Sequence, residues 1–188
     1  MGLFDRLFGG RFSLPPPDEP AISEAEAFRA LHPCKRELKA FAQALLQRLP
    51  AAERERLVRR VMRAYTLGDE PTAALLDGLL DPDKGQRPEH LTLLAVDVRG
   101  FDQFEYLAPL LVATRAIGAG YRYTPAHALA MTQVLAEFDQ WLTGHGQRWL
   151  YLSSDADQYV GLIAEPAQVE PLIALAAQAQ IRLSLQPD

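Results

Sequence analysis

The stretch that most constrains the fold runs from Arg148 to Ala164, where two apolar segments flank a polar one. Its sequence is RWLYLSSDADQYVGLIA, and the central SSDADQ supplies Ser and Asp side chains, which bond to nearby backbone N–H groups in turns. Short apolar segments bounded by turn residues are typical of strands that are covered on both faces. We therefore expect a β-hairpin inside the core, with its turn at the surface.

Strands and helices alternate in the pattern around this hairpin. The run LTLLAVDV predicts a strand covered on both faces, and the alternating IRLSL near the C-terminus predicts an edge strand. Helices are expected over 102–117, from Thr124 to Gly144 or Gly146, and from Pro166 onward. If the first two helices form one crossover, the result is the split βαβ, or ferredoxin-like, order, with the first and third strands central and parallel. The predicted fold class is α+β, with an N-terminal helical segment before a four-stranded sheet.

The N-terminal part of the chain carries helical signals. Ser23 followed by Glu26 is a capping box, and Pro50, Gly68 and Pro71 mark the ends and starts of amphipathic segments. DPDKGQRP is rich in turn formers and predicts a loop. The expected division is an amphipathic tail with a proline-rich linker (1–20), a helical segment (21–88) and an α+β domain (89–188).

Four apolar residues at helical spacing stand at the start of the chain: Leu3, Phe4, Leu7 and Phe8. They indicate a docking peptide for a partner or, less favoured, for a membrane surface; the alternative is a tail that merely packs somewhere on the protein. No apolar run approaches the roughly 20 residues that span a bilayer, and the N-terminus lacks the apolar core of a secretory signal. The expected location is therefore the cytoplasm.

Charge and cysteine content exclude several function classes. The net charge is −5, and residues 91–188 contain ten acidic and only five basic side chains, which is the opposite of a chain that coats nucleic acid. The single cysteine excludes an internal disulfide and a multi-cysteine zinc site. No glycine-rich phosphate-binding motif and no serine-hydrolase elbow is present, so the sequence predicts no cofactor and no catalytic residue.

An acidic group is the first candidate binding surface. Carboxylates that converge from a strand end and a hairpin turn could bind Mg²⁺, Mn²⁺ or Ca²⁺ through oxygen. The alternative is turn-forming and capping acids in water. The expected strand order favours that alternative, because a third strand parallel to the first places the hairpin turn near the start of the first strand, away from its end. The group comprises Asp97, Asp102, Glu105, Asp155 and Asp157.

An arginine face is the second candidate. Arg56, Arg59, Arg60 and Arg63 recur at the spacing of one helix face. They could bind phosphates or an acidic partner. The alternative is a solvated face, paired with nearby glutamates, opposite the apolar stripe of the same helix.

The segments LLAVDVRGFDQFEYL and FDQWLTGHGQRWLYLSSDADQYVGLIAEP, with the final helix and strand, resemble an uncharacterised bacterial family known only as a domain of unknown function. The resemblance covers residues 91–185 and implies an α+β domain with no established activity. The favoured hypothesis is a non-catalytic protein-binding module of accessory, adaptor or immunity type. The alternatives are a divalent-metal-dependent enzyme that uses Asp97, Asp102, Asp155 and Asp157, and, less favoured, an anionic-surface or nucleic-acid binder that uses the arginine face.

Overall fold

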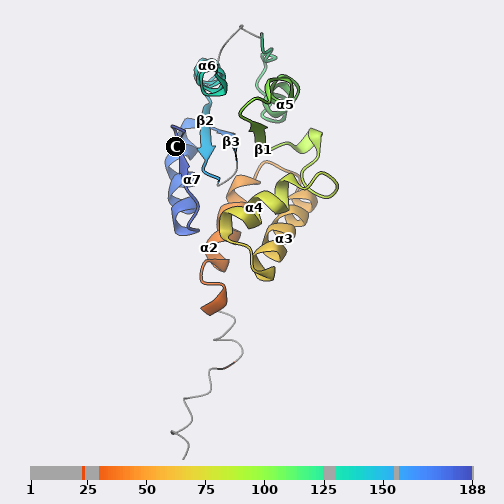
Figure 1. The fold of residues 1–188 in the computed structure, drawn as a ribbon, viewed down its shortest axis with the longest axis vertical. Coiled ribbons are helices and arrows are strands. Elements are labelled where there is room, and N and C mark those ends of the chain that lie inside the picture. Colours follow the sequence, from red (N-terminus) through yellow and green to blue (C-terminus); the bar gives the residue numbers. More distant parts are fainter. Residues whose placement is uncertain (1–22, 24–29, 125–129, 155–156, 188) are drawn as a thin grey trace, which may run out of the picture. The chain divides into compact units, whose positions relative to one another are not determined.

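The computed structural model describes Ser23 and residues 30–124, 130–154 and 157–187. The chain divides into two compact units, Met1–Leu31 and His32–Asp188, and all named elements belong to the second. The helices are α2 (Lys35–Leu45), α3 (Ala51–Leu67), α4 (Pro71–Leu80), the short 3₁₀ helix η1 (Pro88–His90), α5 (Phe101–Thr114), α6 (Met131–Thr143) and α7 (Pro166–Gln178). The strands are β1 (Leu93–Asp97), β2 (Arg148–Leu152), β3 (Gln158–Ala164) and β4 (Leu183–Ser184), and the fold is α+β (Figure 1).

The predicted hairpin is confirmed, whereas the predicted ferredoxin-like order is wrong. β2 and β3 pair antiparallel, with Trp149 opposite Ile163. The described strands form a sheet in the order β1-β3-β2-β4, in which every neighbouring pair is antiparallel. β1 is thus an edge strand rather than a central one, and it runs antiparallel to β3. The expected edge position of the last strand is confirmed.

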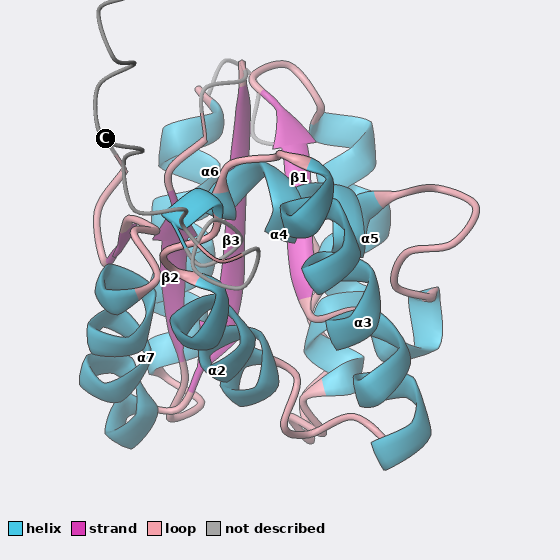
Figure 2. Ribbon diagram, turned by 90° about the horizontal axis from the view of Figure 1, so that it is seen from below, coloured by secondary structure: helices cyan, strands magenta, loops and turns pink. Residues whose placement is uncertain are grey.

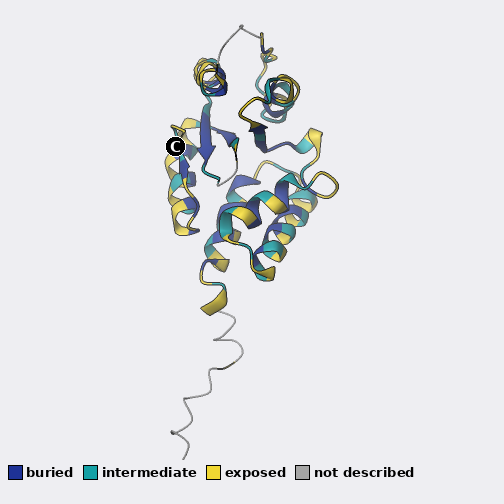
Figure 3. Ribbon diagram, in the orientation of Figure 1, coloured by how far each residue is buried: buried dark blue, intermediate teal, exposed yellow. Residues whose placement is uncertain are grey.

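Helices cover both faces of the sheet, which explains why an edge strand is apolar throughout. Leu93 points into the core shared with α2, α3, α4 and α7, whereas its neighbour Leu94 points into the core shared with α5 and α6. Figure 2 shows the strands between these two helical layers, and in Figure 3 the strands are coloured largely as buried. The apolar pattern of LTLLAVDV therefore reports two covered faces and not a central position in the sheet.

A side chain covers the free edge where β1 begins. The Gln86 amide oxygen accepts from the backbone N–H of Thr92 at 2.9 Å and of Leu93 at 3.0 Å. The amide nitrogen of Gln86 donates to the Leu93 carbonyl. The loop before η1 thus satisfies backbone groups that an edge strand leaves unpaired.

Local signals explain the helix boundaries. α3 follows Pro50 and ends at Gly68, whose φ of 115° is the left-handed conformation that favours glycine. Pro71 and Pro166 occupy the first positions of α4 and α7, as expected. α6 begins at Met131, later than the expected Thr124, and residues 125–129 lie outside the described part of the chain.

The helical segment and the sheet share one core. Leu38, Leu57 and Leu75 from the helices belong to the same buried cluster as Leu150 and Leu162 from the hairpin. The expected boundary after residue 88 therefore lies inside one compact unit. Two predictions lie outside the described residues. One is the capping box, of which only Ser23 is described and Glu26 is not; the other is the docking peptide with Leu3, Phe4, Leu7 and Phe8. No helix of the described residues is long and apolar enough to cross a membrane.

Candidate functional site

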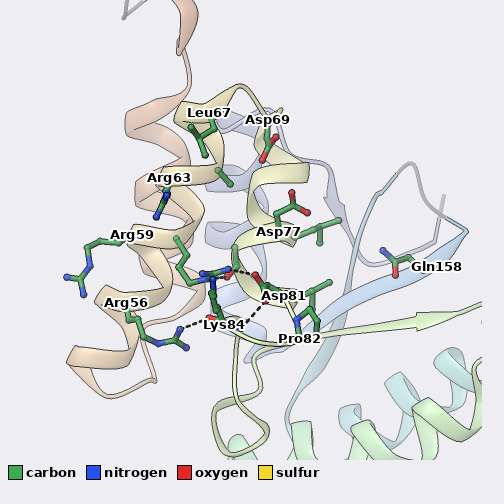
Figure 4. Close-up of a pocket in the computed structure, with 15 residues that line it drawn as sticks. Arg56, Arg59, Arg63, Leu67, Asp69, Asp77, Asp81, Pro82, Lys84 and Gln158 are labelled. Carbon is green, nitrogen blue, oxygen red and sulfur yellow. Dashed lines mark hydrogen bonds and ion pairs between the residues drawn. The ribbon is translucent and has the colours of Figure 1, made fainter.

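A surface groove of about 1070 Å³ lies between α3 and α4, and we call it the α3–α4 groove. All four residues of the predicted arginine face line it (Figure 4). The other wall comes from α4 and the segments that flank it. The remaining lining residues are Ala64, Leu67, Asp69, Leu76, Asp77, Gly78, Leu80, Asp81, Pro82, Lys84 and Gln158.

Two of the four arginines are occupied by the protein itself. Arg56 makes a bidentate pair with Glu53, at 2.6 and 2.7 Å, and donates to the carbonyls of Lys84 and Gly85. Arg60 pairs with Asp81 at 2.7 Å. These bonds fasten the loop after α4 to α3. Arg56 and Arg60 are thus paired with acidic residues of the protein itself, as the alternative interpretation of the arginine face expects.

The outer pair, Arg59 and Arg63, is exposed and only weakly engaged by the protein itself. Arg59 meets Glu55 only at 3.8 Å, and both side chains are about 70% exposed, so the pair contributes little. Arg63 is exposed, and among the described residues its side chain has no hydrogen-bond or ion-pair partner; only its backbone carbonyl accepts a bond, from the Thr66 hydroxyl at 3.0 Å. Leu67 lies one turn further along the same face of α3 and is 76% exposed. The groove therefore combines two available cations with an unburied leucine.

The opposite side of the groove carries carboxylates. Asp69, before α4, and Asp77, in α4, line the groove, and Figure 4 shows the Arg59 side chain extending away from them. Asp81 accepts backbone N–H bonds from Asp83 and Lys84, both at 2.9 Å. These bonds, the Lys84 bond first, hold the pKa of Asp81 below its usual range, and Arg60 lowers the pKa further. The groove is thus polarised, with cations on α3 and carboxylates around α4.

The acidic candidates lie closer together than expected, because β1 is antiparallel to β3. Asp97 stands opposite Gln158, so the end of β1 lies beside the start of β3 and its turn. Asp97 accepts a 2.9 Å bond from the Arg99 backbone N–H, as a turn-forming acid does. Asp102 and Glu105 are exposed in the first turns of α5, Asp157 is exposed, and Asp155 lies outside the described residues. Among the described residues, no group of three acids, histidines or cysteines could hold a metal ion.

The apolar and acidic parts of the groove were not predicted from the sequence. Leu67 stands off the buried stripe of α3 and continues its arginine face, which is a readable signal for an exposed leucine. Gly78 inside α4 is the second signal, because a glycine within a helix often marks close packing. Asp69 and Asp77 carry no local signal that places them opposite the arginines.

Comparisons with protein-family models, curated proteins and solved structures find no match for this chain. The resemblance to a bacterial domain of unknown function therefore stays a prediction. The geometry of the α3–α4 groove is the remaining guide to function.

Proposed function

We propose that this chain is a non-catalytic protein-binding module that holds an acidic, apolar-anchored segment of a partner protein in the α3–α4 groove. The observation that carries the proposal is the exposed Leu67 beside the available cations Arg59 and Arg63. Helix-binding grooves commonly combine apolar contacts with flanking charges that set orientation. Leu76 and Leu80, both partly buried, add apolar surface to the groove.

Charge in the groove favours a protein over a nucleic acid. Asp69, Asp77 and Asp81 lie in the same hollow as the arginines, so a continuous phosphate backbone would meet repulsion along it. A protein segment can place acids against α3 and basic or neutral residues against α4. The net charge of −5 also disfavours binding of a nucleic acid.

A pair of synthetic helical peptides tests the proposal. Both carry leucines at helical spacing; one has glutamates beside them and the other lysines at the same positions. We expect the glutamate peptide to shift the amide NMR signals of α3 and α4 and to bind at least threefold more tightly than the lysine peptide. An exposed charge pair contributes about 0.2–1 kcal/mol to binding, and the expected difference in affinity is the sum over the two arginines, Arg59 and Arg63.

Charge-reversal variants provide the control. Arg59→Glu with Arg63→Glu should reverse the order of the two peptides, whereas Arg36→Glu, which changes an exposed arginine on α2, should leave it intact. Equal binding of both peptides, or no shift in α3 and α4, would refute the proposal. Tight, salt-sensitive binding of a single-stranded oligonucleotide that depends on Arg59 and Arg63 would instead support the nucleic-acid alternative.

The metal-dependent enzyme stands second. Its one supporting observation is the β1–β3 register, which brings Asp97 and the hairpin turn to the same end of the sheet. We favour the groove because Arg59 has only a weak ion pair, the Arg63 side chain has no partner among the described residues, and Leu67 is exposed.

A further inference from the structure

A second, smaller pocket of about 80 Å³ lies where the turn after α2, the 3₁₀ helix η1 and the end of α5 meet. We call it the Arg48–Arg115 pocket. None of its lining residues belongs to the α3–α4 groove. They are Leu45, Arg48, Leu49, Pro50, Glu89, His90, Leu91, Thr92, Thr114 and Arg115.

Arg115 ends α5 with a guanidinium that is partly buried. Among the described residues, no hydrogen bond or ion pair reaches it. Burial, and then the charge of Arg48, lowers the pKa of Arg115 to about 10. A cation that has lost water and gained no carboxylate is a destabilising feature unless something else neutralises it.

Arg48 supplies a second cation at the same pocket. It forms an ion pair with Glu165 at the start of α7, and its side chain is 37% exposed. The carboxylate of Glu165 therefore holds Arg48 in place while Arg48 still repels Arg115. The remaining acid at the pocket, Glu89, is exposed and makes no ion pair with Arg115.

A histidine and a threonine side chain complete the wall. The Nδ1 atom of His90 is buried and has no partner among the described residues. The Thr114 hydroxyl oxygen lies 2.7 Å from the Leu91 carbonyl oxygen and 2.8 Å from that of Leu111, so its one hydrogen can be donated to either; the bond to Leu91 ties the end of α5 to the segment before β1. Pro50 precedes α3, so the positive end of that helix dipole also lies beside the pocket.

We propose that the Arg48–Arg115 pocket binds a tetrahedral oxyanion, either free phosphate or the phosphate group of a small monoester. Guanidinium groups match the geometry of phosphate oxygens and bind them through charge-assisted hydrogen bonds. A pocket of about 80 Å³ has room for an ion of five heavy atoms, at roughly 10–15 Å³ for each water-sized atom. An anion placed there neutralises the repulsion between the two arginines.

Thermal unfolding at pH 7 tests this site with three additions of matched ionic strength: sodium chloride, inorganic phosphate and glycerol 2-phosphate. We expect phosphate to raise the melting temperature by several degrees over chloride once it reaches about 100 times its dissociation constant. An equal rise with glycerol 2-phosphate identifies the phosphate group of a monoester as an acceptable ligand. A rise with inorganic phosphate alone restricts the pocket to the free ion.

Variants separate a site from a general salt effect. Arg115→Gln should abolish the phosphate shift, and it should fold, because it removes a poorly solvated charge that has no internal partner. Arg48→Gln should weaken phosphate binding at least tenfold by titration calorimetry. Arg36→Gln, on the exposed face of α2, should keep the full shift. The proposal is overturned if phosphate gives wild type no shift over chloride, or if Arg115→Gln keeps the same shift.

Discussion

Gly161 in β3 lies against the indole ring of Trp149, and this contact tests the packing of the hairpin. A Cβ atom at Gly161 would lie 2.2 Å from Cζ2 of Trp149 and 2.5 Å from the carbonyl oxygen of Leu150. Trp149 is fully buried and is among the largest side chains of the core. A methyl group can therefore enter only if the ring and the neighbouring strand move.

Whether Gly161→Ala raises or lowers the free energy of unfolding tests this contact. Without a clash, alanine in a strand would stabilise the protein by about 0.5–1 kcal/mol relative to glycine. Overpacking a core costs about 1–3 kcal/mol, and a 2.2 Å contact with a buried ring falls at the upper end of that range. We expect a net loss of about 2 kcal/mol in the free energy of unfolding, measured by urea denaturation. In a chain of this size the melting temperature should fall by about 4–8 °C.

A double-mutant cycle assigns the cost to the indole. In a Trp149→Leu background, Gly161→Ala should cost at least about 1 kcal/mol less than in wild type, because the ring contact is gone. The matched control is Gly118→Ala, where an added Cβ meets nothing within 4 Å and should change stability by less than about 1 kcal/mol. If Gly161→Ala is as stable as wild type, or if the two substitutions are additive, the described packing is incorrect.

Two further predictions concern pH. Burial raises the pKa of Tyr151 to about 12, so its contribution to stability is complete below the unfolded value near 10 and is lost as pH rises toward 12. Between pH 9 and 12, the free energy of unfolding of Tyr151→Phe, measured by urea denaturation, should therefore fall by about 2–3 kcal/mol less than that of wild type. An equal fall in both proteins would contradict this. The pKa of Asp81 is lowered, so its contribution is present above the unfolded value near 4 and is lost as pH falls through the folded value. Asp81→Asn keeps an acceptor for the loop N–H groups but loses the charge that faces Arg60, so melting curves of the variant should depend less on pH below 4 than those of wild type.

Local signals in the sequence predict the elements well because each acts over a few residues. Pro50, Gly68 and Pro71 bound helices as expected, since proline fits a helix start and glycine tolerates the left-handed end. The Ser and Asp residues between the two apolar segments 149–152 and 159–164 predict the hairpin for the same reason. These choices depend on the backbone itself and need no knowledge of distant contacts.

Strand order could not be predicted because it depends on distant contacts. An apolar strand fits the centre of a sheet, but it fits an edge equally well when helices cover both faces, as α5 and the α4 region do for β1. Backbone groups at the start of that edge are bonded by Gln86, whose role no periodicity reveals. The error about β1 produced the second error, namely the expected separation of Asp97 from the hairpin turn.

The α3–α4 groove also depends on a contact between segments that are distant in the sequence, and that contact is made at Gly78. A Cβ atom at Gly78 would lie 2.6 Å from the Val61 side chain, so only glycine lets α4 approach α3 this closely. That approach brings the Gly78 carbonyl within 3.3 Å of the Arg60 guanidinium and Asp81 within 2.7 Å of it. The helical spacing of the arginines correctly placed them on one face, but this contact decides that Arg60 joins α3 to the α4 side while Arg63 remains exposed. The shape of the α3–α4 groove therefore depends on one glycine in the facing helix, which the arginine pattern alone does not reveal.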